Sequence, residues 1–302
     1  MIHEPVTKTL IVIAGPTAAG KTAAAIELAK QLHTEIISAD SRQLYREMSI
    51  GTAKPSAEEL SAVKHHFIDS HSITEIFSVG DFEKQALQVL NDIFKTHDFA
   101  LLVGGSGLYI KAVCEGFDDL PTASAEIRER LNHEFEEKGL TWLQEKLKVA
   151  DPVYASQVDM NNPQRLIRAL EVTESTGQPF SSYRKSTVNL RPFNIIKLGL
   201  NLPREVLYDR INRRVDDMIS KGLVEEVRSL LPYRQLNALN TVGYSELFDY
   251  FDGKTDMDTA ISLIKQNTRR FAKRQLTWFR KDKEIKWLDA ANLNFNDLGL
   301  PL

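Results

Sequence analysis

Residues 8–22 read KTLIVIAGPTAAGKT, and this stretch decides the fold. Lys8 to Ala14 is a short apolar run rich in β-branched residues, which predicts a buried strand. Thr22 to Leu32 is rich in Ala, Leu and Lys with apolar residues at helical spacing, which predicts a helix. A strand, a glycine-rich turn and a helix in this order indicate a phosphate-binding loop of the pattern G-x-x-x-x-G-K-[ST]. The loop residues are Gly15, Pro16, Thr17, Ala18, Ala19, Gly20, Lys21 and Thr22.

Such a loop binds phosphate mainly through its backbone. The N–H groups of the turn and of the helix N-terminus point at phosphate oxygens, and Lys21 adds a positive charge. The hydroxyl of Thr22 can reach a metal ion or a phosphate oxygen. The pattern therefore predicts a phosphate site, but it does not specify the reaction.

The rest of the chain predicts an α/β fold with a P-loop NTPase-like, doubly wound parallel sheet. Further strands are expected at Glu35–Ser38, Phe99–Val103, Phe193–Leu200 and Ile285–Leu288. They alternate with helical patterns, including one at Asp81–Lys95, and this alternation is typical of parallel sheets. Another helix should begin after Ser56, because Glu59 three residues later completes a capping box.

The middle of the chain differs. Residues 121–184 show no strand signal, but several amphipathic helical patterns. One helix should begin at Asn162-Pro163, an N-cap followed by a first-turn proline, and end at Gly177. We therefore expect a catalytic core of residues 1–120 and 185–302 with an all-helical insertion domain at 121–184.

The composition places the protein in the cytoplasm. The longest apolar runs, such as Leu10–Ala14, are far shorter than the ~18 residues of a membrane span, so no membrane partner is expected. The first eight residues do not resemble a signal peptide. The single cysteine, Cys114, excludes an internal disulfide and a four-cysteine zinc site. A monomer is the default expectation.

Charge is concentrated near the C-terminus. Between Lys265 and Lys286 lie nine basic and two acidic residues, which gives this stretch 9 − 2 = +7 and leaves −10 for the remainder of a chain of net charge −3. This stretch is either a polyanion-binding element or a solvated helix face. Its aromatic residues Phe271, Trp278 and Phe279 have helical spacing and are expected to anchor the helix to the core.

One acidic residue stands out at a strand end. Enzymes that transfer phosphoryl groups commonly place an Asp after a neighbouring strand to hold magnesium, yet the strand at Phe99–Val103 runs into Gly104 and Gly105. Asp40 instead follows the strand Glu35–Ser38, and strand ends face the ligand crevice in a parallel sheet. Asp40 can bind metal, act as a general base, or merely cap the next turn.

Six segments carry a resemblance to a known family. In order they are GPTAAGKT, DSRQLYREMSIGTAKPS, HHFID, LLVGGSGLYIKA, NPQRLIRALEV and RRFAKRQLTWFRK. Together they closely resemble the tRNA dimethylallyltransferases, and the single cysteine favours the bacterial type, which lacks a zinc finger. The resemblance implies transfer of a dimethylallyl group from dimethylallyl diphosphate to N6 of adenosine 37, in tRNAs that read codons starting with U. Pyrophosphate is released, and the phosphate loop holds it with Mg²⁺.

The resemblance also implies roles for individual residues. Asp40 matches the general base, while Lys21, Thr22 and Arg214 match contacts to the leaving group, with Thr22 also a ligand of Mg²⁺. Contacts to the anticodon stem-loop of tRNA are implied for Asp40, Ser41, Arg42, Gln43, Ser106, Arg128, Gln164, Arg165, Leu166, Ile167 and Arg168. Two positions depart from the family. Ser106 replaces a usual Thr, and Ser245 follows Gly243-Tyr244 where a basic residue is usual.

Other interpretations stay open at this point. A P-loop nucleotide kinase fits the loop, although the glycines after Phe99–Val103 and the basic C-terminal stretch count against it. An adenylate prenyltransferase would use the same chemistry on AMP or ADP, but the large insertion favours a macromolecular acceptor. A tRNA-binding protein without activity would leave Lys21, Thr22 and Asp40 unexplained.

Overall fold

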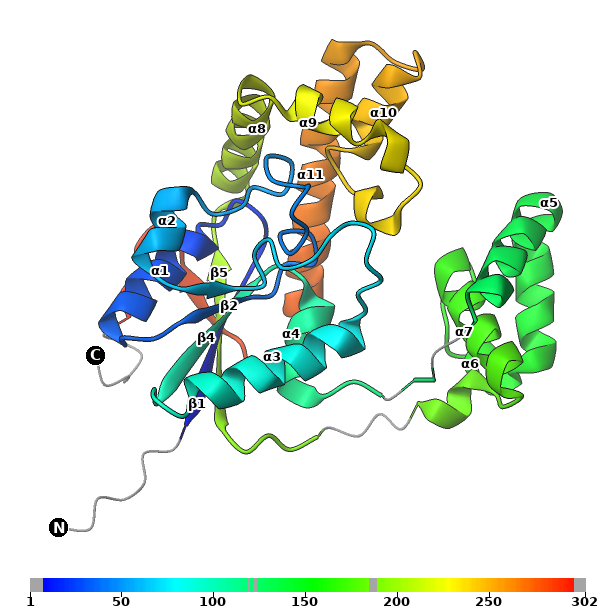
Figure 1. Ribbon diagram of the computed structural model, residues 1–302, viewed down its shortest axis with the longest axis horizontal. Helices are drawn as coiled ribbons and strands as arrows, with labels where there is room; N and C mark the ends of the chain where they lie inside the picture. Colours follow the sequence, from blue (N-terminus) through cyan, green and yellow to red (C-terminus); the bar gives the residue numbers. More distant parts are fainter. Residues whose placement is uncertain (1–7, 119, 122–123, 185–188, 296–302) are drawn as a thin grey trace. The chain divides into compact units, whose positions relative to one another are not determined.

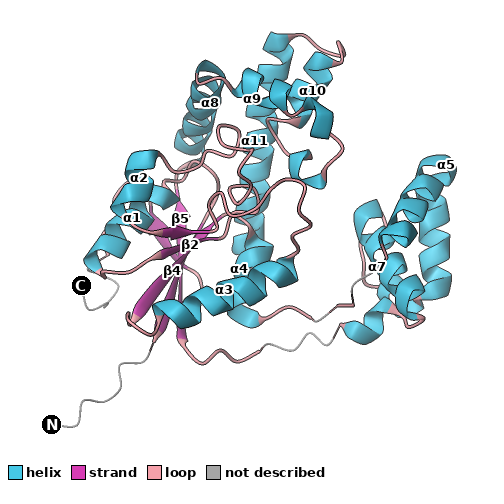
Figure 2. Cartoon of the chain, viewed as in Figure 1, coloured by secondary structure: helices cyan, strands magenta, loops and turns pink. Residues whose placement is uncertain are grey.

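The computed structural model describes residues 8–118, 120–121, 124–184 and 189–295. Its sheet confirms the predicted α/β class, with six parallel strands in the order β3-β2-β4-β1-β5-β6 (Figures 1 and 2). The strands are β1 Thr9–Ala14, β2 Ile36–Ser38, β3 His65–His66, β4 Phe99–Gly104, β5 Asn194–Asn201 and β6 Lys286–Asp289. The two-residue strand β3 was not predicted, because it is too short to show an alternating pattern.

Helices cover both faces of the sheet, which is why every residue of β1 is buried. Successive side chains of a strand point to opposite faces. Leu10 and Val12 pack in the cluster that contains α3 (Val79–Ile93) and α4 (Gly107–Glu115). Ile11 and Ile13 pack instead against α1 (Lys21–Gln31). The central strand is thereby held on both sides at the point where the phosphate loop begins.

The remaining helices of the core follow the chain order. The capping box at Ser56 and Glu59 is present and begins α2 (Ala57–Ala62). After β5 come α8 (Arg204–Ser220), α9 (Leu223–Ser229), α10 (Ser245–Phe251) and α11 (Met257–Phe279), with short 3₁₀ turns at Leu231–Tyr233 and Asn237–Leu239. None of the described helices is long and apolar enough to cross a membrane.

The basic stretch forms only part of a helix. α11 ends at Phe279, so the charges from Arg280 to Lys286 lie beyond it. Phe279 is 2% exposed and anchors the helix as expected. Trp278 is partly exposed but packs against the backbone of Gly107, where an added Cβ would lie 2.1 Å from the indole Nε1.

The chain divides into two compact units, one of residues 1–115 and 190–302 and the other of residues 116–189. The described part of the second unit is helical and is called the insertion unit here. It contains α5 (Ala125–Ala150), α6 (Pro152–Ala155), α7 (Pro163–Thr176) and a 3₁₀ turn at Phe180–Tyr183. It has its own core, which includes Leu131, Leu147 and Leu170.

The predicted ends of α7 are confirmed. The side chain of Asn162 accepts a hydrogen bond from the N–H of Arg165, and Pro163 occupies the first turn. Gly177 ends the helix in a left-handed conformation, with a φ of 70°. Local capping therefore fixes both ends of the helix that carries residues 168–172, and the capping residues lie within this segment of the chain.

Candidate active site

The phosphate loop joins β1 to α1 and needs glycine at both ends. Gly20 has a φ of 91°, a left-handed conformation that other residues adopt only with strain. At Gly15 an added Cβ would lie 2.8 Å from the carbonyl oxygen of Leu200 in β5. No described side chain caps the N-terminus of α1. The first N–H groups of this helix are therefore available to an anion.

Two half-buried cations, Lys21 and Arg214, lie beside the loop. The Nζ of Lys21 donates to the carbonyl oxygen of Pro16 at 2.7 Å, and Nη1 of Arg214 in α8 donates to Oγ1 of Thr17 at 3.2 Å. The pKa of Lys21 is lowered to about 8, mainly by burial; the charge of Asp40 acts to raise it and that of Arg214 to lower it. Burial likewise lowers the pKa of Arg214. A bound anion would compensate the desolvation of both groups.

The side chain of Gln275, in α11, joins the phosphate loop to the backbone at Gly105, just after β4. Its Oε1 accepts from the N–H of Thr17 at 2.9 Å, and its Nε2 donates to the carbonyl oxygen of Gly105 at 3.0 Å. The side chain is buried on the inner face of α11, in line with Ala272 and Phe279. Sequence reasoning missed this residue, although a polar residue at a core position of an amphipathic helix was the available signal.

Asp40 lies just beyond β2 and caps the turn that follows, which is one of the three roles considered above. Its Oδ1 accepts from the N–H of Arg42 at 2.9 Å and from the N–H of Gln43 at 3.3 Å, so it caps the turn. Oδ2 accepts no hydrogen bond from the described residues. Capping by one oxygen fixes the carboxylate in place and leaves the other oxygen for a ligand.

Close packing explains the missing acid after β4. At Gly104 an added Cβ would lie 2.1 Å from the carbonyl oxygen of Ala39, and at Gly105 it would lie 2.2 Å from Nε2 of Gln275. No side chain fits at Gly104, where the clash is with backbone, and at Gly105 a side chain would displace Gln275 from its hydrogen bonds. The next residue, Ser106, faces the Asp40 turn, where its Oγ accepts from the N–H of Ser41 at 2.9 Å.

A single cavity of about 600 Å³ brings these groups together. Its wall includes Thr17, Lys21, Asp40, Ser41, Arg42, Gln43, Ser106, Arg214, Ser245 and Gln275. Phe271 also lines it, with its side chain 40% exposed and the guanidinium of Arg274 5.7 Å from the ring centre. The expectation that Phe271 anchors α11 to the core is therefore wrong, because the ring faces the cavity.

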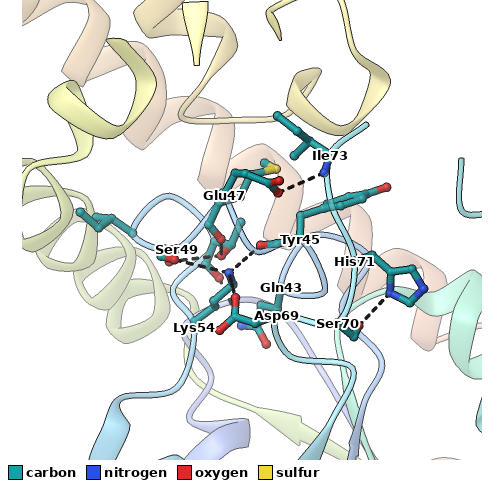
Figure 3. Close-up of polar contacts among 12 residues, drawn as sticks. Gln43, Tyr45, Glu47, Ser49, Lys54, Asp69, Ser70, His71 and Ile73 are labelled. Carbon is teal, nitrogen blue, oxygen red and sulfur yellow. Dashed lines mark hydrogen bonds and ion pairs between the residues drawn. The ribbon is translucent and has the colours of Figure 1, made fainter. Parts of the chain in front are cut away.

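The segment that follows Asp40 is held by a buried lysine (Figure 3). Nζ of Lys54 donates to the carbonyl oxygen of Tyr45 at 2.6 Å and to Oγ of Ser49 at 3.4 Å, and it forms an ion pair with Asp69. Glu47 accepts from the N–H of Ile73 at 3.0 Å. These contacts fasten residues 43–54 to the segment around residues 69–73, so the floor of the cavity keeps its shape.

A second anchor comes from α9. The carboxylate of Glu226 accepts from the N–H groups of Ser49, Ile50 and Gly51 at 2.7–3.0 Å. It also accepts from the hydroxyl of Tyr244, which is fully buried, at 2.7 Å. Sequence reasoning singled out neither Glu226 nor the role of Tyr244, because the backbone groups that Glu226 binds lie about 175 residues away in the chain.

The insertion unit carries the other predicted tRNA contacts. Arg128 lies on α5, and Gln164, Arg165 and Arg168 lie on α7, with Gln164 and Arg165 exposed. Leu166 and Ile167 are 0% and 1% exposed in the core of the unit. Both side chains pack α7 against its neighbours, and contacts of these two residues to RNA stay a prediction.

Comparisons with known proteins agree with this geometry. Residues 43–282 match the family model described as IPP transferase. The tRNA dimethylallyltransferase of Christiangramia forsetii is 59% identical over 280 residues, which is 93% of each chain. That of Cytophaga hutchinsonii is 52% identical over 288 residues and 95% of each chain.

Solved structures give the same result. The tRNA isopentenylpyrophosphate transferase of Bacillus halodurans superposes with a TM-score of 0.70 at 41% identity, covering 96% of this chain and 93% of that one. A eukaryotic dimethylallyltransferase acting on tRNA superposes with a TM-score of 0.78 at 27% identity, covering 94% and 74%. The phosphate loop, the strand-end carboxylate and these relatives lead to one conclusion: the chain belongs to the tRNA dimethylallyltransferase family.

Proposed function

We propose that the protein transfers a dimethylallyl group from dimethylallyl diphosphate to N6 of adenosine 37 in tRNAs that read codons starting with U. One observation carries the proposal. A single cavity holds two half-buried cations, Lys21 and Arg214, and the carboxylate of Asp40, one oxygen of which accepts no hydrogen bond from the described residues. Cations suit a diphosphate leaving group, and a carboxylate suits the proton of an attacking amino group.

The chemistry follows from these positions. N6 of the adenosine forms a bond to the first carbon of the dimethylallyl group while the bond from that carbon to the diphosphate oxygen breaks. Negative charge builds on the diphosphate, where the loop N–H groups, Lys21 and Arg214 stabilise it. The proton that N6 loses passes to Oδ2 of Asp40, whose Oδ1 is held by the N–H groups of Arg42 and Gln43. The products are the prenylated adenosine and pyrophosphate.

Mg²⁺ fits this site as a partner of the diphosphate. The described residues contain no group of three His, Cys, Asp or Glu side chains that would hold a resident metal ion. Mg²⁺ often keeps several waters and takes phosphate oxygens, so it needs few protein ligands. The hydroxyl of Thr22, at the start of α1, would supply one of them. When bound, the ion would neutralise part of the diphosphate charge.

The acceptor is proposed to be the anticodon stem-loop of tRNA. Ser41, Arg42, Gln43 and Ser106 surround the carboxylate of Asp40 in the cavity. An enzyme that acts on a base must first take it out of the stack, and a deep cavity with a carboxylate inside suits a flipped adenosine. We further propose that the protein works as a monomer in the cytoplasm.

A transfer assay tests the proposal. The protein is incubated with Mg²⁺, labelled dimethylallyl diphosphate and either AMP or an anticodon stem-loop with adenosines at positions 36 to 38. We expect label in the stem-loop alone. Label in AMP would show that the acceptor is wrong, and transfer of phosphate from ATP without prenylation would show that the chemistry is wrong.

A further inference from the structure

We infer that Glu171 is a positioning residue for tRNA binding, which holds the guanidinium groups of Arg168 and Arg128 where they meet the phosphates of the RNA. This rests on the proposed function, in which tRNA is the acceptor, and on the tRNA contacts that the family resemblance predicts for both arginines. Glu171 lies on α7 and is 1% exposed. Its Oε1 accepts from Nη1 of Arg168 at 2.5 Å, and Nη1 of Arg128, from α5, lies 3.6 Å from the same oxygen.

Stability alone explains this carboxylate poorly. Burying a carboxylate costs free energy that an ion pair often fails to recover, and an apolar side chain of similar size would serve the core better. Its neighbours Leu170 and Val172 are fully buried in the core of the insertion unit. Oε2 of Glu171 is buried without a hydrogen-bond partner among the described residues. The buried charge therefore lowers the stability of the insertion unit, and packing of the unit's core does not require a charge at this position.

The two arginines remain open to a ligand. The side chain of Arg168 is 38% exposed and that of Arg128 is 50% exposed. Each guanidinium has five N–H donors in a fixed plane, so a contact to Glu171 leaves donors for a phosphate. Two guanidinium groups from different helices would otherwise repel each other. A carboxylate between them fixes their planes, and the RNA phosphates can then occupy the outer donors.

The same helix offers a matched control. Glu174 lies three residues after Glu171 on α7 and also joins two cations of α5, with ion pairs to Arg130 and to Lys146. Both of its oxygens are used, Oε2 by Arg130 and Oε1 by Lys146 at 2.9 Å, and its side chain is 23% exposed. Neither Arg130 nor Lys146 is a predicted tRNA contact. Glu174 thus fastens the same two helices without serving the arginines that face RNA.

The test measures the dissociation constant of an anticodon stem-loop at several salt concentrations. The variants are Glu171→Gln, Glu174→Gln, Arg168→Ala, Arg128→Ala and the double variant Glu171→Gln/Arg168→Ala. We expect Glu171→Gln and Arg168→Ala each to weaken binding about tenfold, the order for losing one hydrogen bond of a charged group. The double variant should lose less affinity than the product of the two single fold-losses, because Glu171 acts through Arg168. In the variants that bind more weakly, the slope of the logarithm of the association constant against the logarithm of the salt concentration should become shallower by about 0.7–0.9 per lost phosphate contact.

Two readouts separate positioning from stability. The KM for dimethylallyl diphosphate should stay unchanged in Glu171→Gln, and Glu174→Gln should bind the stem-loop like the parent protein. If Glu171→Gln does not fold, Glu171→Asp replaces it. That variant keeps the carboxylate but moves it away from the two guanidinium groups by one methylene, and it should also weaken stem-loop binding.

Three results would overturn the inference. Unchanged or tighter binding by Glu171→Gln, while Arg168→Ala weakens it, removes the role of Glu171 but leaves the tRNA contacts in place. Equal losses in Glu171→Gln and Glu174→Gln show a purely structural effect. Normal binding by both arginine variants refutes the tRNA contacts themselves, and the inference falls with that part of the proposed function.

Discussion

The core unit and the insertion unit hold their functional side chains in different ways. In the core, backbone atoms and buried groups do so: Lys21 bonds to a carbonyl of its own loop, and Asp40 caps its own turn. In the insertion unit, ion pairs with Glu171 hold the two arginines predicted to contact RNA, Arg168 from the same helix and Arg128 from α5. Backbone contacts fix an atom closely, whereas partly exposed ion pairs allow adjustment. In the proposed function, the groups that react lie in the core, and the arginines that bind the polyanion lie on helices of the insertion unit.

The largest effect should come from the group that reacts. Asp40→Asn keeps an oxygen that can accept from the N–H groups of Arg42 and Gln43, so the turn should survive. It removes the proton acceptor, and turnover should fall by about 10²–10⁴. Single-turnover assays with stem-loop and labelled donor measure this. The assigned base is refuted by turnover within a few-fold of the parent, and Asp40→Ala, which also removes the cap, should be no more active.

The next effect separates the stabilities of the two units. Leu170 is fully buried in the core of the insertion unit, and Leu170→Ala should cost about 2–5 kcal/mol of unfolding free energy. We expect calorimetry to show a lower unfolding temperature for this unit. The affinity of the core for inorganic pyrophosphate should stay unchanged. Leu102→Ala in β4 is the counterpart, which should lower pyrophosphate binding and core stability together. A parallel loss of pyrophosphate affinity in Leu170→Ala would contradict the separation.

The pH dependence should also differ between the units. The pKa of Lys21 is lowered to about 8, so this group loses its proton as the pH rises through that value and no longer attracts the diphosphate. kcat/KM for the donor should fall roughly tenfold per pH unit above that pKa. Stem-loop binding by arginines should stay constant over the same range, because arginine keeps its charge.

The control for this profile is Lys21→Arg, which keeps its charge at high pH. Whatever its activity at neutral pH, its profile should lose the decline. A decline of equal size in Lys21→Arg would assign the titration to another group.

The smallest effect concerns the departure from the family at Ser245. This residue lines the cavity, and its hydroxyl donates to the carbonyl oxygen of Thr241 at 3.2 Å. Ser245→Lys restores a basic residue and should tighten stem-loop binding about threefold, mainly at low salt. Titrations at two salt concentrations measure the gain, with Ser245→Gln as the uncharged control. An equal gain in Ser245→Gln would exclude electrostatics as the cause.

Much of the site could be predicted because its signals are local. The apolar run of β1, the glycines of the loop and the turn at Asp40 each depend on residues a few positions apart. Leu166 and Ile167 show the opposite case. The segment that resembles a tRNA-binding motif contains both buried side chains, which pack α7, and exposed side chains. Only the burial seen in the structure distinguishes the buried side chains from the exposed ones.

The sequence by itself determined the strand, loop and helix proposed to bind phosphate, the parallel α/β class and the helical insertion, because periodicity and capping act over short spans of chain. The tertiary structure decided which distant groups complete the loop. Arg214 reaches Thr17 across 197 residues, and Gln275 reaches it across 258. No local pattern encodes these contacts, because they depend on how α8 and α11 pack beside the carboxyl end of the sheet. The same packing excludes a side chain at Gly104 and leaves Asp40 as the carboxylate of the cavity wall nearest the loop cations.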